Sequence, residues 1–279
     1  EQEGITKILG VPTIFSGLLQ HPDLKKYNLS SLKEVIIGGA ASSLSLIEKL
    51  EAEIGCKAIV GYGLTETSPF AVIARPKPHL KEDERTRLTT QVKTGLPIVG
   101  VQLRVVAENG NDVPADEKAI GEIVFRSNAV MKGYRKDQAA TDAVIKDGWF
   151  HSGDMAVVDP EGYITIVDRK KDIIISGGEN ISSVEVEKII QNHPAVFEAV
   201  VIGVPDEKWG EVPKALIVLK PGVEANEQEI LQFVRKYLAG YKVPKSVEFR
   251  KELPKGGTGK ILKKELREPY WEGYEKRIH

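Results

Sequence analysis

The sequence lacks several features that would place it in a specialised class of protein. Its single cysteine, Cys56, cannot form an internal disulfide, so nothing argues for secretion. No apolar run approaches the roughly 20 residues that a membrane-spanning helix needs. The 39 basic and 40 acidic side chains leave a net charge of −1, which gives no reason to expect nucleic acid as a partner. We therefore expect a globular, cytoplasmic protein with no transmembrane segment and no bound nucleic acid.

The start of the chain also lacks a methionine and the charged-then-apolar pattern of a signal peptide. Instead, Ile5, Ile8 and Leu9 follow one another at helical spacing, which predicts that the chain opens inside a helix. We accordingly expect a C-terminal fragment of a longer polypeptide.

Three segments with different patterns follow one another along the chain. Residues 1–91 contain apolar runs that stop at glycine loops, with helices between them, as is typical of a parallel α/β sheet. Residues 92–167 contain short strands separated by turns, which predict a β-barrel-like subdomain. Residues 168–279 contain capped helices and further strands, which predict an independent small α+β domain. The expected fold is therefore the remnant of a large α/β domain, a β-barrel-like subdomain and a small hinged C-terminal α+β domain.

Periodicity and turn residues locate individual elements within these segments. The predicted strands are Leu32–Ile37, Ala58–Val60, Val101–Val106, Gly121–Phe125, Met155–Val158, Tyr163–Val167, Val196–Val204, Ala215–Leu219 and Ser246–Phe249. The predicted helices cover Ser45–Ile54 and Asp137–Ile145, and further helices follow the capping residues Ser182 and Asn226. The Pro- and charge-rich segment Arg75–Thr90 has little apolar content and predicts an exposed loop.

A charged segment, Asp168–Asp172, separates a predicted hairpin from a glycine loop. The hairpin consists of the apolar runs that flank the turn Asp159–Gly162, and the glycine loop contains Gly177 and Gly178. Nothing in Asp168–Asp172 is apolar enough to bury, so we expect an exposed connection between two domains that move.

The loop Gly61–Thr67 combines a flat ring, a hydroxyl and a carboxylate. It is not a dinucleotide fingerprint, because Glu66 stands where the third glycine would be. Glycines let a ligand approach the backbone closely. Tyr62 can stack on a base, Thr65 can bind a phosphate, and Glu66 can hold Mg²⁺. An ordinary turn with a core tyrosine and a helix-capping threonine explains the same residues, and the loop alone does not decide between the two interpretations.

The segment Lys255–Lys260 looks like a phosphate-binding loop but fails the Walker pattern. Pro254 stands where the first glycine would be, and Ile261 replaces the required Ser or Thr. A lysine flanked by glycines can still serve as a mobile point charge for a phosphate. A solvated basic turn is the alternative.

The segment before the hairpin carries an isolated carboxylate, Asp154. It is not a hydrolase elbow, because Phe150 stands where that motif has glycine. Asp154 can accept two ribose hydroxyls or simply cap a turn. Cys56 has no neighbouring His or Cys at ligand spacing, so we do not expect it to bind a metal.

The order of these motifs resembles that of the adenylate-forming superfamily, which includes acyl-CoA synthetases, beetle luciferases and the adenylation domains of peptide synthetases. The matching motifs are Gly38-Gly39-Ala40, Tyr62-Gly63-x-Thr65-Glu66, Gly148-Trp149-x-x-x-Gly153-Asp154, Asp168-Arg169-Lys170-x-Asp172 with its glycine loop, and Pro254-Lys255-x-x-x-Gly259-Lys260. The resemblance covers nearly the whole chain. Within the superfamily, Ile181–Glu211 is most similar to the fatty- or aromatic-acid CoA ligases.

The resemblance implies a nucleotide site in the first two segments. Gly38, Gly39 and Ala40 would line the adenine and acyl pocket. Tyr62 would stack on adenine, Thr65 would contact the α-phosphate, and Glu66 would bind Mg²⁺. Asp154 would hold the ribose hydroxyls, with Arg169 nearby.

The resemblance also implies that the last segment serves two half-reactions. Asp168 would be the hinge about which the C-terminal domain rotates. Lys260 would serve the first half-reaction, so that Lys260, Thr65 and Glu66 form the catalytic set. Gly178 would line the tunnel through which the pantetheine arm of CoA passes in the second.

The expected function is that of an AMP-forming acid–CoA ligase. It uses ATP, Mg²⁺ and CoA to convert a carboxylic acid first into acyl-AMP and pyrophosphate, then into acyl-CoA and AMP. The family's Ser/Thr/Gly-rich phosphate loop has no counterpart before Gly38, so we expect the 279-residue chain to be inactive alone. The alternatives are an adenylation domain that loads a carrier protein, an enzyme that oxidises its acid, and a non-catalytic nucleotide- or CoA-binding fragment. The identity of the acid and the oligomeric state are not predicted.

Overall fold

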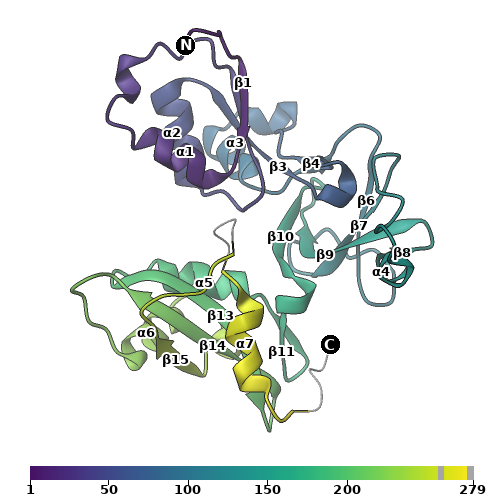
Figure 1. Cartoon of the computed structure of the whole chain (residues 1–279), viewed down its shortest axis with the longest axis vertical. Helices are drawn as coiled ribbons and strands as arrows, with labels where there is room; N and C mark the ends of the chain where they lie inside the picture. Colours follow the sequence, from purple (N-terminus) through teal and green to yellow (C-terminus); the bar gives the residue numbers. More distant parts are fainter. Residues whose placement is uncertain (257–260, 275–279) are drawn as a thin grey trace. The chain divides into compact units, whose positions relative to one another are not determined.

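The structure is a computed structural model that describes residues 1–256 and 261–274 (Figure 1). The chain folds as two compact units, Glu1–Ile166 and Val167–His279. The first unit contains a largely parallel sheet with helices and a separate antiparallel sheet, and the second contains one mixed sheet with helices. The predicted mixture of α/β and α+β architecture is confirmed.

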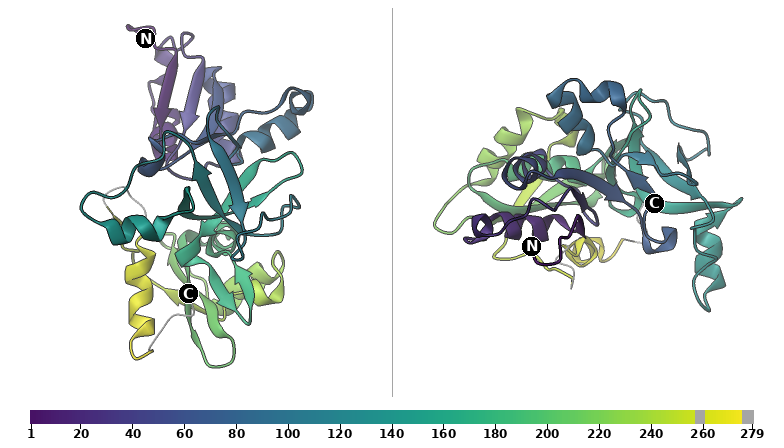
Figure 2. Two further views of the ribbon diagram at one scale, coloured as in Figure 1. Left: turned by 90° about the vertical axis from the view of Figure 1, so that its right-hand side faces the viewer. Right: turned by 90° about the horizontal axis from the view of Figure 1, so that it is seen from above.

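The first sheet of the first unit has the strand order β1-β2-β3-β4-β5. Its first three strands run parallel, and the left view of Figure 2 shows them side by side. They are β1 (Lys7–Gly10), β2 (Glu34–Ile37) and β3 (Lys57–Tyr62). Two short antiparallel strands complete the sheet, β4 (Val72–Ile73) and β5 (Leu96–Pro97). The carboxyl ends of β2 and β3 therefore meet at one edge.

The prediction of a helix around Ile5, Ile8 and Leu9 is wrong. Lys7–Gly10 is the parallel strand β1, which pairs with β2. The segment is too short to sustain an isolated helix, and a new helix begins directly after it at Pro12. Pairing with β2 satisfies its backbone groups instead, so tertiary contacts override the local spacing.

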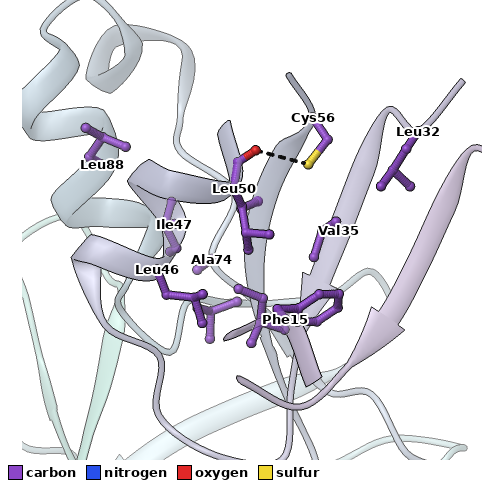
Figure 3. Packing of buried hydrophobic residues seen from close by; sticks show 12 residues of the cluster. Phe15, Leu32, Val35, Leu46, Ile47, Leu50, Cys56, Ala74 and Leu88 are labelled. Carbon is purple, nitrogen blue, oxygen red and sulfur yellow. Dashed lines mark hydrogen bonds between the residues drawn. The ribbon is translucent and has the colours of Figure 1, made fainter. Parts of the chain in front are cut away.

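Helices α1 (Pro12–Leu19) and α2 (Leu44–Ile54) bury their apolar faces against this sheet. Figure 3 shows Phe15, Ile47 and Leu50 among the clustered side chains, and each of the three is at most 1% exposed. Burial raises the pKa of the Cys56 thiol, which donates to the carbonyl oxygen of Leu50 at 3.8 Å. Cys56 is therefore a core residue.

The segment Arg75–Thr90, expected to be an exposed loop, contains the short 3₁₀ helix η3 (Pro78–Lys81) and most of helix α3 (Glu84–Gln91). Helix α3 buries a single apolar side chain, Leu88, and polar bonds supply most of its other contacts. Arg87 donates to Glu51 at 2.7 Å, and the buried Gln91 amide donates to Glu51 and to the carbonyl of Ala58 at 2.9 and 2.7 Å. Hydrophobic periodicity cannot detect a helix anchored in this way.

The second sheet of the first unit has the order β10-β9-β7-β6, and β8 pairs with β9. The strands are β6 (Gln102–Val106), β7 (Gly121–Arg126), β8 (Ile145–Lys146), β9 (Trp149–Val158) and β10 (Ile164–Arg169). Within the described residues the sheet stays open, so the expected barrel-like region is β-rich but not a closed barrel. Helix α4 (Gln138–Val144) forms as predicted, and Asp137 caps it.

The second unit is built on a sheet of order β12-β11-β14-β13, with β15 parallel to β14. Its strands are β11 (Ile174–Ser176), β12 (Glu179–Ile181), β13 (Val196–Asp206), β14 (Gly210–Leu219) and β15 (Ser246–Phe249). Its helices are α5 (Ser183–Gln191), α6 (Glu227–Arg235) and α7 (Lys263–Trp271). Ser182 and Asn226 cap α5 and α6 as predicted. No helix in the described ranges is long and apolar enough to cross a membrane.

The expectation that Asp168–Asp172 is fully exposed is wrong, because both of its aspartates are buried. The Asp168 carboxylate accepts hydrogen bonds from the backbone N–H and the hydroxyl of Ser183, both at 2.6 Å. It thereby stabilises the N-terminus of α5, where backbone N–H groups lack helical partners. Asp172 pairs with Arg267 at 3.1 Å. Hydrogen bonding, rather than apolar character, makes this burial possible.

A half-buried lysine on α7, Lys263, extends this polar cluster. Lys263 Nζ donates to Ser183 Oγ at 2.5 Å and pairs with Glu187 at 2.7 Å. Glu187 also accepts the backbone N–H of Val201 at 2.8 Å. Burial raises the pKa of the Glu187 carboxyl, and the Lys263 ammonium opposes that rise. Lys263 therefore compensates the negative charge of Glu187, which α5 places against β13.

We predict that Leu50→Ala lowers the free energy of unfolding by about 2–5 kcal/mol, because it leaves a cavity in the core of the first unit. Leu9→Ala is the matched control, since Leu9 is 58% exposed and Leu50 is fully buried. Equilibrium urea unfolding followed by circular dichroism measures both effects. Equal effects of the two substitutions would contradict the packing in Figure 3.

We predict that Lys263→Met lowers the free energy of unfolding by about 3–5 kcal/mol at neutral pH, because the largely covered carboxylate of Glu187, 14% exposed, is left without its cation. Since the folded-state pKa of Glu187 is raised, its protonation favours the folded state, and this contribution is lost as the pH rises through the folded pKa. The deficit of the variant relative to wild type should therefore shrink as the pH is lowered.

The same unfolding measurements at several pH values test this sign. In the Lys263→Met background, Glu187→Gln should remove the pH dependence of the deficit. A deficit that grows on acidification would show that Glu187 is not the group responsible.

Candidate functional site

Strand β9 contains a bulge that redirects Asp154. His151 pairs with Val124 and Met155 pairs with Glu122, so three residues of β9 lie opposite the single residue Ile123. Gly153, at the centre of the bulge, has a φ of +71°, which favours glycine. The sequence His-Ser-Gly-Asp thus encodes an irregular turn inside a strand.

Hydrogen bonds from both sides hold the bulge. Ser152 Oγ donates to the carbonyl of Ile123 at 2.7 Å and accepts the N–H of Asp154 at 3.1 Å. The buried Glu122 carboxylate accepts the N–H of Gly153 at 3.1 Å and contacts His151 Nδ1 at the same distance. The sequence analysis did not identify Glu122, because only the register of β7 against β9 places it beside the bulge.

The bulge aims Asp154 at Tyr62. The Tyr62 hydroxyl donates to Asp154 Oδ2 at 2.5 Å, although the two residues are 92 positions apart. Tyr62 is the last residue of β3, and Asp154 is only 7% exposed. An aromatic ring and a carboxylate therefore lie together at the carboxyl end of a parallel strand, where ligands of such sheets commonly bind.

Glycines next to Tyr62 allow the backbone to approach closely. A Cβ atom on Gly63 would lie 1.7 Å from the carbonyl oxygen of Pro69, so no larger residue fits there. The glycine loop after β2 is adjacent, since a Cβ on Gly38 would lie 3.3 Å from the carbonyl oxygen of Gly61. Gly39 follows with a φ of +77°, and Ala40 comes next. The structure thus brings the two predicted glycine loops together.

The carboxylate of Glu66 has a partner that the sequence analysis missed. Glu66 lies in the short 3₁₀ helix η2 (Thr65–Thr67), and its Oε1 accepts the Tyr134 hydroxyl at 2.9 Å. Burial, followed by the bond to Glu66, raises the pKa of Tyr134. The phenol therefore keeps its proton and remains a donor at neutral pH. Gly133, just before Tyr134, is the one sequence signal of an unusual backbone here.

The carboxylates of this unit do not form a protein-only metal cage. Among the described residues, no group of three or more His, Cys, Asp or Glu side chains is arranged to hold a metal. Mg²⁺, however, is usually bound through one or two carboxylates together with phosphates and water. A single carboxylate such as Glu66 therefore fits a cation that arrives with a nucleotide.

The remaining predicted residues lie in or beside the second unit. Asp168 is part of the buried polar cluster, and Arg169, whose N–H donates to Asp168 Oδ1 at 2.8 Å, ends β10. Gly178 has a φ of +88° in the two-residue turn between β11 and β12. Lys260 lies outside the described residues. The two groups of residues are thus defined separately, one in each unit.

The predicted glycine loop that contains Gly177 and Gly178 is a tight hairpin turn. Gly177 donates its N–H to the carbonyl of Trp209 at 2.9 Å, and a Cβ there would lie 2.6 Å from the Trp209 ring. By contrast, no atom of residues 1–256 or 261–274 lies within 4 Å of a Cβ built on Gly178. Gly178 is therefore open to an approaching group, and its φ rather than crowding favours glycine.

Comparison with known proteins identifies the family. The family model of the AMP-binding enzyme matches residues 1–135, and that of the AMP-binding enzyme C-terminal domain matches residues 185–260. A feruloyl-CoA synthase from Amycolatopsis sp is 44% identical over 267 residues, which cover 96% of this chain and 52% of that protein. A long-chain-fatty-acid–CoA ligase from Bacillus subtilis (strain 168) is 42% identical over 269 residues, covering 95% and 46%.

A solved structure gives the same answer for the fold. The amide bond synthetase McbA from Marinactinospora thermotolerans matches with a TM-score of 0.81 and 31% identity, over 97% of this chain and 53% of that one. The chain spans about half the length of the curated relatives it matches. These matches agree with the motifs that resemble adenylate-forming enzymes, and the chain belongs to the AMP-binding enzyme family.

Proposed function

We propose that this chain acts in an AMP-forming acid–CoA ligase. The observation that carries the proposal is the 2.5 Å hydrogen bond between Tyr62 and Asp154. It holds a flat aromatic ring beside a carboxylate, and these are the groups that recognise a base and the two hydroxyls of a ribose. The neighbouring glycine loops leave backbone groups accessible to the same ligand.

The proposed nucleotide contacts follow from this pair. Tyr62 stacks on adenine, and Asp154 accepts the ribose hydroxyls, with Arg169 nearby. Thr65, which is exposed at the start of η2, contacts the α-phosphate. Gly38, Gly39 and Ala40 line the adenine and acyl pocket.

The proposed chemistry is an in-line displacement. A carboxylate oxygen of the acid attacks the α-phosphorus, a P–O bond forms, and pyrophosphate leaves with its electron pair. Glu66 would hold Mg²⁺, which would neutralise phosphate charge when bound, and Lys260 would supply a further positive charge. The protein contributes mainly by positioning and by preorganised electrostatics.

A second half-reaction completes the cycle. The thiol of CoA loses its proton and attacks the acyl carbonyl, and AMP leaves. Gly178 lines the CoA tunnel in this proposal, since its open surroundings suit a narrow pantetheine arm. Asp168 is the hinge about which the C-terminal domain rotates between the two half-reactions. The boundary between the two compact units at Ile166 and Val167 supports a hinge at this position. The proposed domains remain 1–91, 92–167 and 168–279.

The names of the relatives suggest the class of acid and leave the acceptor open. A feruloyl-CoA synthase and a long-chain-fatty-acid–CoA ligase both match over most of this chain, so we propose an aromatic or fatty acid. The amide bond synthetase favours a second candidate, in which an amine replaces CoA as the acceptor. The near-zero net charge suits a cytoplasmic enzyme that does not bind nucleic acid.

The test is a substrate screen with the protein expressed from its complete reading frame. Pyrophosphate release is followed with ATP and a panel of aromatic and fatty acids, and CoA is then exchanged for amines. Acid-dependent pyrophosphate release followed by CoA-dependent thioester formation would support the proposal. Amide formation with no thioester would favour the second candidate, and the absence of any acid-dependent release would contradict both.

We predict that Lys260→Ala slows adenylation by about 10²-fold or more, because it removes a preorganised charge. Chemically supplied acyl-adenylate should still be converted to thioester. Gly178→Trp should do the reverse, since it fills the path of the pantetheine arm while leaving single-turnover pyrophosphate release intact.

Separate assays of the two half-reactions in each variant measure this division. Lys264→Ala is the matched control, since the Lys264 side chain is 78% exposed and, among the residues that the structure describes, pairs only with Glu268 on its own helix. If Lys260→Ala impairs both half-reactions equally, the proposed division of labour is wrong.

A further inference from the structure

The segment Met131–Tyr134 forms two hydrogen bonds with Glu66, one to its main chain and one to its side chain. The N–H of Met131 donates to the backbone carbonyl of Glu66 at 2.8 Å. The hydroxyl of Tyr134 donates to Oε1 of the same residue at 2.9 Å. The segment Met131–Tyr134 thus fixes both the main chain and the side chain of Glu66, although Tyr134 is 68 positions away in the sequence.

Tyr134 is itself held by a polar anchor. Its N–H donates to Thr141 Oγ1 at 2.9 Å, and that hydroxyl donates to the carbonyl of Asp137 at 2.8 Å. Thr141 is buried on α4, whose first turn Asp137 caps. The position of the Tyr134 ring therefore depends on a capped helix and a buried hydroxyl.

Gly133 is required for this arrangement. Its φ is +154°, and a Cβ atom there would lie 2.7 Å from Cγ2 of the buried Thr141. Any larger residue would push the chain away from Thr141 and move Tyr134. The glycine thus permits the close contact that places the phenol against Glu66.

The bond from Tyr134 fixes Glu66 without neutralising it. Within the described ranges, Glu66 forms no ion pair, and the Tyr134 hydroxyl is the one side chain that hydrogen-bonds its carboxylate. A lysine or arginine in this place would cancel the negative charge that attracts a cation. A phenol supplies one neutral donor to one oxygen, so the carboxylate keeps its charge and loses rotational freedom.

We propose that Tyr134 is a positioning residue that orients Glu66 toward a divalent cation carried by a bound nucleotide. This inference rests on the proposed function, since it takes Glu66 as the cation ligand. Preorganisation lowers the cost of ordering the carboxylate when the cation arrives. Tyr134 touches neither nucleotide nor cation in this proposal and acts through Glu66.

The test measures cation binding rather than turnover. The protein expressed from its complete reading frame is saturated with a non-hydrolysable ATP analogue and titrated with Mn²⁺, and unbound Mn²⁺ is followed by electron paramagnetic resonance. Tyr134→Phe should weaken the apparent Mn²⁺ affinity about tenfold, as expected for the loss of one hydrogen bond to a charged group. The affinity for the analogue without any divalent cation should not change.

Three further variants separate positioning from general damage. Gly133→Ala should weaken Mn²⁺ binding in the same direction, because it displaces Tyr134. Glu66→Gln should weaken it more than Tyr134→Phe does. Tyr270→Phe is the matched control, since it removes another tyrosine hydroxyl bonded to a carboxylate, that of Glu248 in the second unit, and it should leave Mn²⁺ binding unchanged.

The outcomes distinguish this inference from the proposed function. If wild type binds Mn²⁺ with the analogue and Tyr134→Phe binds it equally well, the positioning role is wrong and the proposed function stands. If Tyr134→Phe weakens cation-free analogue binding as much as Mn²⁺ binding, the role is merely structural and the inference fails. If wild type shows no analogue-dependent Mn²⁺ binding, the proposed function fails and this inference fails with it.

Discussion

The hydrogen bond between Tyr62 and Asp154 is the contact on which the candidate site depends. It joins the last residue of a parallel strand to a bulge in an antiparallel sheet, across 92 positions of sequence. Each of the two residues depends on a neighbouring glycine. Gly63 allows the tight turn after Tyr62, and Gly153 adopts the backbone conformation of the bulge that directs Asp154 toward Tyr62. The glycines in these motifs are thus explained by geometry at the point where ring and carboxylate meet.

A second set of charges organises the other unit. Helix α7 presents Lys263 and Arg267, one turn apart, toward the buried carboxylates of Asp168 and Asp172 and the half-buried carboxylate of Glu187. The Ser183 hydroxyl links Lys263 to Asp168, since it accepts a hydrogen bond from the Lys263 ammonium and donates one to the Asp168 carboxylate. The charged segment that leads into the second unit is therefore anchored to that unit's own helices. Any movement about Asp168 has to preserve or exchange these bonds, since a buried carboxylate without partners is costly.

The sequence predicted the parts of the fold that rest on local patterns. Strands ending at glycine loops, the capped helix after Ser182 and the hairpin around Asp159–Gly162 all carry such patterns. It failed where long-range contacts decide. β1 is a strand because β2 lies beside it, and α3 is held by Gln91 and Arg87 together with one buried apolar side chain, Leu88. Tyr134 and Glu122 were missed for the same reason, since only tertiary structure brings them to Glu66 and Gly153.

The central claim is that Tyr62 and Asp154 form a nucleotide site, and titration of the chain with AMP tests it most directly. Asp154→Ala should weaken AMP binding about 10–100-fold, through the loss of charge-assisted bonds to the ribose. Asp116→Ala is the matched control in the same unit, because Asp116 is exposed and, within the described part of the chain, accepts only the backbone N–H groups of its own turn. AMP should bind this control as tightly as it binds wild type. If wild type and Asp154→Ala bind AMP equally, or if neither binds it, this assignment of the site is wrong.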